Sequence, residues 1–174
     1  MKKGILIILV FAALFSFTSQ ADAEILVRPY GTIGGTDVDL PGALDWDTTR
    51  SGGGLQGAYE IFENFSIGLD LAHIYSYYYE IVYGYNVTYM NFLGFAEYHY
   101  NIVMLQAGLG PYIGTGINDD TPFGMMFAGG LDIPIAKSLS VTLMARVDIV
   151  FENWYKGDGN TIMPAFMGGL TIRF

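Results

Sequence analysis

After residue 23 the chain alternates between apolar and polar positions with the period of two that β-strands produce. Eight such segments are bounded by turn-forming residues. They cover residues 24–35, 52–61, 66–78, 87–99, 103–116, 123–134, 139–151 and 161–174. Most are longer than an ordinary soluble strand and match the about nine to eleven residues with which a tilted strand crosses a bilayer. The pattern therefore predicts eight strands that cross a membrane.

The connections between these segments alternate in length. The three tight ones run from Phe62 to Phe65, Tyr100 to Ile102 and Ile135 to Ser138. The others are mostly longer and richer in Asp, Gly and Asn. Short turns at one end and long loops at the other are typical of outer-membrane barrels with both termini in the periplasm. The predicted fold is all-β: an eight-stranded antiparallel transmembrane up-and-down β-barrel.

The composition of the two strand faces indicates which face meets lipid. Every charge in the predicted strands fits on one parity, and the other parity holds nearly all the large aliphatic side chains, such as Leu105 and Leu143. An Arg or Lys at the lipid midplane costs about 2–4 kcal/mol, so a lipid face free of charge is expected. The polar face is interpreted as a narrow lumen of Gly, Ala, Ser and Thr with paired charges. The predicted lumen charge network comprises Arg28, Glu60, Asp70, Glu97, Asp132, Arg146, Asp148 and Arg173.

The first 23 residues have the pattern of a secretory signal peptide. Lys2 and Lys3 precede an apolar run from Ile5 to Phe17, and Ala21 to Ala23 form an A-x-A cleavage site. An uncleaved N-terminal anchor is the alternative, but the apolar run is short for a membrane helix. We therefore expect residues 1–23 to be removed and residues 24–174 to form one barrel domain. The chain has no cysteine, so neither disulfides nor thiolate metal sites stabilise it.

Charge limits the possible partners. Without residues 1–23 the chain has six Lys and Arg against sixteen Asp and Glu, a net charge of −10. This charge argues against nucleic acid as a partner.

The predicted last strand has Leu170, Ile172 and Phe174 on one face. It resembles the C-terminal signal that the barrel-assembly machinery recognises in outer-membrane proteins. Over residues 24–174 the chain resembles the small outer-membrane β-barrel superfamily that includes the OmpA membrane domain and OmpX. The resemblance implies a monomer in the bacterial outer membrane, in contact with lipid and lipopolysaccharide, assembled by that machinery and holding no cofactor.

Tyrosines crowd the connection between the third and fourth segments. We expect them to form the outer aromatic girdle, where an amphipathic ring lies at the level of the lipid headgroups. A platform that binds sugars or other ligands is the alternative. The girdle is predicted to include Tyr75, Tyr77, Tyr79, Tyr83 and Tyr85, with Tyr78 and Tyr89 in the same group.

The sequence gives little sign of catalysis. Small barrels that modify lipid A need a nucleophile, a base and an orienting carboxylate at the membrane rim. The two histidines are His73 and His99, and neither lies in the His-x-Ser pair of the lipid A deacylases. His99 also precedes a predicted periplasmic turn, far from outer-leaflet lipid. We predict no enzyme activity.

Acidic residues in the long connections have two interpretations. They could bind divalent cations together with lipopolysaccharide phosphates, or they are solvated carboxylates, which is the interpretation we favour because their spacing matches no EF-hand loop. We predict no metal site. The residues are Asp37, Asp39, Asp45, Asp47, Asp119 and Asp120.

The leading functional hypothesis is a structural or surface-interaction role in the bacterial envelope. A narrow pore or carrier of small molecules is the alternative, and a lipid A-modifying enzyme is a third. A soluble lipocalin-like barrel would need Lys- and Glu-rich faces in water, which this chain does not have.

Overall fold

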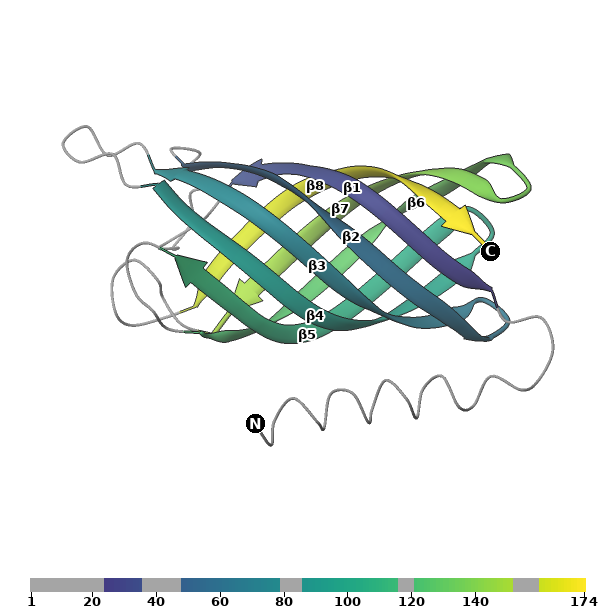
Figure 1. The fold of residues 1–174 in the computed structure, drawn as a ribbon, viewed down its shortest axis with the longest axis horizontal. Helices are drawn as coiled ribbons and strands as arrows, with labels where there is room; N and C mark the ends of the chain where they lie inside the picture. Colours follow the sequence, from purple (N-terminus) through teal and green to yellow (C-terminus); the bar gives the residue numbers. More distant parts are fainter. Residues whose placement is uncertain (1–23, 36–47, 79–85, 116–120, 152–159) are drawn as a thin grey trace.

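The computed structural model describes residues 24–35, 48–78, 86–115, 121–151 and 160–174. Eight antiparallel strands form a closed barrel in which each strand pairs with its sequence neighbours and the first pairs with the last (Figure 1). The strands are β1 (Ile25–Gly35), β2 (Thr48–Phe62), β3 (Phe65–Tyr78), β4 (Asn86–Tyr100), β5 (Val103–Thr115), β6 (Phe123–Ala136), β7 (Leu139–Val150) and β8 (Thr161–Arg173). The prediction of an eight-stranded up-and-down barrel is confirmed. The predicted signal peptide lies outside the described residues, in which no helix is long and apolar enough to cross a membrane.

The β2 strand begins earlier than its sequence predicts. The second segment was predicted to begin at residue 52, yet β2 already starts at Thr48. Gly54 is needed here as a strand residue, because a Cβ at this position would lie 2.5 Å from the Tyr30 ring and 2.5 Å from the Leu71 carbonyl oxygen. Gly54 therefore marks close packing inside the barrel rather than a turn.

The three tight connections lie at the end of the barrel that carries the C-terminus (Figure 1). The β2–β3 turn contains Asn64 with φ of 68°, and the β4–β5 turn contains Asn101 with φ of 58°. Asparagine tolerates this left-handed backbone conformation better than most residues with a side chain. At the same end the barrel closes where the amide nitrogen of Phe174 donates to the carbonyl oxygen of Ile25 over 3.0 Å.

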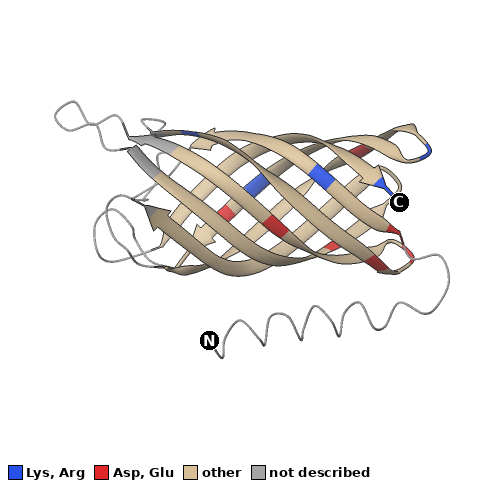
Figure 2. Cartoon of the chain, viewed as in Figure 1, with Lys and Arg blue, Asp and Glu red and all other residues tan. Residues whose placement is uncertain are grey.

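The two faces of the strands differ as predicted. The outer face is apolar, with Leu105 57 %, Leu109 60 % and Leu143 51 % exposed. Most charged positions lie in the middle of the barrel and toward the C-terminal end (Figure 2). The lumen also holds larger side chains than expected. Alongside the small residues it buries these methionines and aromatic residues: Tyr30, Tyr89, Phe95, Met104, Tyr112, Met126, Met144, Met163 and Met167.

Candidate functional site

Arg146 forms the centre of the lumen network. From β7 its guanidinium lies 2.6 Å from an Asp70 oxygen on β3, on the opposite side of the barrel, and 2.8 Å from an oxygen of Asp148. The Tyr30 hydroxyl donates to Asp70 over 2.7 Å, and the Tyr112 hydroxyl donates to Asp148 over 2.8 Å. Each buried carboxylate thus has a cation and a hydroxyl donor, which offsets the cost of removing it from water.

Arg50 is a member of this cluster that the sequence interpretation missed. Its guanidinium lies 3.3 Å from Asp148, donates to the Tyr89 hydroxyl over 2.7 Å and donates to the Met163 carbonyl oxygen over 2.5 Å. Arg50 was left out because the second segment was predicted to start at residue 52. Extending its alternation by two residues would have found Arg50, which shares the inward parity of Gly54 and Gln56.

Tyr89 was wrongly grouped with the outer aromatic girdle. The structure buries it in the lumen, 1 % exposed, where its hydroxyl accepts the hydrogen bond from Arg50. Tyr75 does face outward and lies edge-on to the His73 ring. Tyr77 and Tyr78 lie at the end of β3. Tyr79, Tyr83 and Tyr85 fall outside the described residues, as do the six aspartates of the long connections.

A second cluster lies nearer the C-terminal end of the lumen. The Arg28 guanidinium on β1 lies 2.8 Å from Glu97 on β4 and donates to Gln56 over 2.6 Å and to Thr171 over 2.8 Å. Gln106 on β5 also donates to Glu97. These bonds join five strands across the barrel.

Arg173 closes the network at the mouth of the barrel. It pairs with Asp132 on β6 and donates to the Ser140 hydroxyl over 2.5 Å. A Glu24 oxygen lies 3.8 Å from its Nε. The structure therefore brings all the predicted network residues into ion pairs except Glu60, which accepts a hydrogen bond from the backbone nitrogen of Asn64 over 3.1 Å.

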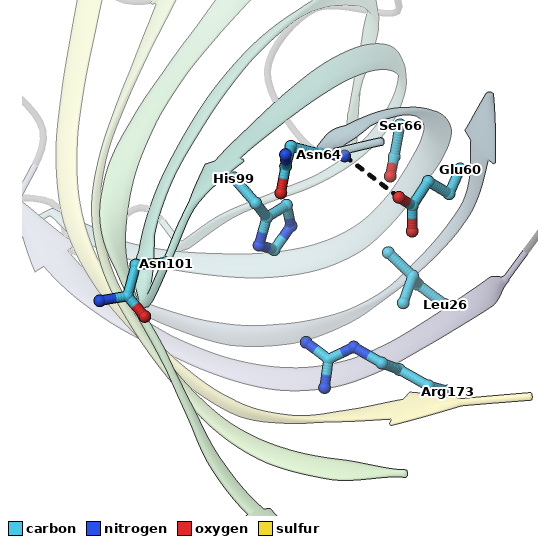
Figure 3. Close-up of a pocket in the computed structure, with 7 residues that line it drawn as sticks. All are labelled: Leu26, Glu60, Asn64, Ser66, His99, Asn101 and Arg173. Atoms are coloured by element: carbon cyan, nitrogen blue, oxygen red, sulfur yellow. Dashed lines mark hydrogen bonds between the residues drawn. The ribbon is translucent and has the colours of Figure 1, made fainter. Parts of the chain in front are cut away.

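A pocket of about 200 Å³ opens at this mouth. Figure 3 shows the side chains of Glu60, His99 and Arg173 pointing toward its common space. His99 Nε2 lies 2.5 Å from Glu97, which connects the pocket to the second cluster. The lining residues are Leu26, Glu60, Asn64, Ser66, His99, Asn101 and Arg173.

The two histidines lie in different surroundings. His73 lies on the outer face, where its ring contacts Tyr75. In the part of the chain that the structure describes, no group of three or more His, Cys, Asp or Glu could hold a metal ion. The charged side chains of the lumen instead link strands on opposite sides of the barrel.

No protein-family model matches the chain, and no curated protein matches its sequence. Solved structures do resemble its fold. Neisserial surface protein A is 10 % identical with a TM-score of 0.58, over 88 % of this chain and 99 % of that one. The attachment invasion locus protein Ail of Yersinia pestis is 16 % identical with a TM-score of 0.55, over 89 % and 100 %. Ail in complex with the heparin analogue sucrose octasulfate gives 0.50 at 16 % identity, over 87 % and 98 %. The chain has the fold of the small eight-stranded β-barrels of the bacterial outer membrane.

Proposed function

We propose that the chain is an integral outer-membrane barrel with a closed lumen, which serves envelope structure or surface interaction and neither catalyses a reaction nor conducts ions. The main support for this proposal is the set of ion pairs that join opposite sides of the lumen. Arg146 and Asp70 meet from opposite strands, and Arg28 and Glu97 meet across the barrel nearer its mouth. An ion passing through would have to separate these buried pairs and leave their charges without partners in the lumen, which is unfavourable.

The charge of the four long connections limits the surface partner. Their sequences, residues 36–47, 79–85, 116–120 and 152–159, carry nine Asp and Glu and one Lys. These connections join strands at the end opposite the tight turns. A polyanion such as the heparin analogue bound to Ail would be repelled by this charge. We therefore expect a cationic partner, or lipopolysaccharide phosphates bridged by divalent cations.

Conductance in planar bilayers tests the closed lumen. We expect the reconstituted protein to show no steady, well-defined conductance, and Lys137→Ala, in the exposed β6–β7 turn, to behave in the same way. A steady wild-type conductance that changes in Arg146→Ala and not in Lys137→Ala would contradict the proposal and support the narrow-pore alternative.

The absence of catalysis is tested on lipid A. Mass spectrometry of lipid A from cells with and without the protein is expected to give the same masses. A change in acylation that depends on the protein would support the enzyme alternative.

A further inference from the structure

The pocket at the barrel mouth contains a carboxylate that the network does not use. Glu60 is half-buried, and among the described residues it has no ion pair, whereas Asp70, Glu97, Asp132 and Asp148 each have a basic partner. Its carboxylate accepts a hydrogen bond from the backbone nitrogen of Asn64. The Glu60 carboxylate therefore has acceptor positions left on the side of the pocket.

The basic groups around the pocket already pair with other carboxylates. Arg173 pairs with Asp132 and lies near Glu24, and Arg28 pairs with Glu97. His99 is bound through Nε2 to Glu97 as well. In these contacts the acidic side chains at the mouth outnumber the basic ones, so the pocket attracts a cation. The acidic side chains are Glu24, Glu60, Glu97 and Asp132, and the basic ones are Arg28, Arg173 and His99.

The rest of the lining supplies neutral hydrogen-bonding groups. Asn64 and Asn101 are the non-glycine residues with positive φ among the described residues, and the side chains of both line this same pocket. Glycine would fit both backbone conformations with less strain but would remove the amide groups. Their carbonyl oxygens, together with the Ser66 hydroxyl, are acceptors for N–H donors.

We propose that this pocket binds a primary ammonium group, with the Glu60 carboxylate as its counterion. An ammonium has three N–H donors and one positive charge, which match the Glu60 carboxylate and the neutral acceptors among the other lining residues. The volume of about 200 Å³ admits a small amine. The ammonium has two sources: an amine or lysine side chain from the periplasm, or the α-ammonium of this chain after cleavage before Glu24. The second source is close, because the Glu60 backbone nitrogen donates to the Glu24 carbonyl oxygen over 3.1 Å.

The test uses protein that begins at Glu24, folded in detergent micelles, with the His99 ring signals followed by NMR while 1,4-diaminobutane is added. It is repeated with the N-terminus acetylated. Glu60→Gln removes the charge with little change in shape. Glu63→Gln is the matched control, because Glu63 lies exposed in the adjacent turn and does not line the pocket.

We expect saturable binding that is at least about tenfold weaker in Glu60→Gln and unchanged in Glu63→Gln, since the substitution at Glu60 removes a charge-assisted hydrogen bond to the ammonium. Binding with a free N-terminus supports the external source. Binding only after acetylation supports the chain's own α-ammonium. Absence of saturable binding in both forms, or equal weakening by the two substitutions, would overturn the proposal. That result would not bear on the proposal of a closed lumen, because the conductance measurement tests the lumen separately.

Discussion

At the scale of single residues, the buried arginines account for much of the lumen's order. Arg146 neutralises Asp70 and Asp148 together, so its removal leaves buried carboxylates short of a cation. Removing one partner of a buried ion pair costs about 3–5 kcal/mol. We expect Arg146→Met to lower the free energy of unfolding by about this amount in urea titrations of the protein in lipid vesicles. Lys137→Met in the exposed turn should change it by less than about 0.5 kcal/mol. Equal stability of the two variants would contradict the bracing role.

Two glycines of β2 give a second comparison between single residues. A Cβ at Gly54 would lie 2.5 Å from both the Leu71 carbonyl oxygen and Tyr30, whereas a Cβ at Gly57 would have nothing within 4 Å. Overpacking typically costs about 1–3 kcal/mol. We expect Gly54→Ala to lower the free energy of unfolding in urea by about 1–3 kcal/mol. Gly57→Ala should leave this free energy unchanged or slightly raised. A Gly54→Ala variant as stable as the wild type would contradict the close packing at this position.

The sequence interpretation failed for a different physical reason at each of three residues. Parity places a side chain inside or outside, but only when the strand's limits are known, and Arg50 was excluded by a strand start set too late. Tyr89 was misplaced because aromatic residues suit both a membrane interface and a packed lumen. Glu60 has inward parity too, yet its lack of an ion pair depends on where the arginines reach in three dimensions.

At the scale of strands, alternation was a reliable guide because only one face can meet lipid. Seven of the eight strands begin within one residue of their predicted starts, and β2 is the exception. Which lumen charges pair could not be predicted, since Arg28 and Glu97 are separated by 69 positions and meet only after closure.

The strands also predict how the free-energy cost of an outward-facing charge depends on its depth in the membrane. Leu109 lies at the middle of β5 and faces outward, whereas Ile135 faces outward at the turn end of β6. Arginine on the lipid face costs about 2–4 kcal/mol at the midplane and about 0–1 kcal/mol near the interface. We expect Leu109→Arg to destabilise the vesicle-embedded barrel by the larger amount and Ile135→Arg by the smaller, as measured by urea unfolding. Equal costs would mean that the apolar outer face is not a membrane belt.

At the scale of the whole molecule, closure between β1 and β8 leaves no free sheet edge, as a strand-built membrane protein requires. The fold alone does not determine the function, because barrels of this size differ mainly in their loops and lumens. Two features of this chain restrict the functions proposed for it: the ion-paired lumen and the acidic connections.

The most direct test of a closed membrane barrel is the electrophoretic migration of the detergent-extracted protein, with and without boiling, together with its circular dichroism spectrum. We expect a strand-dominated spectrum and a compact species whose migration shifts on boiling. A water-soluble protein whose migration does not change on boiling would contradict the membrane barrel and favour the lipocalin-like alternative.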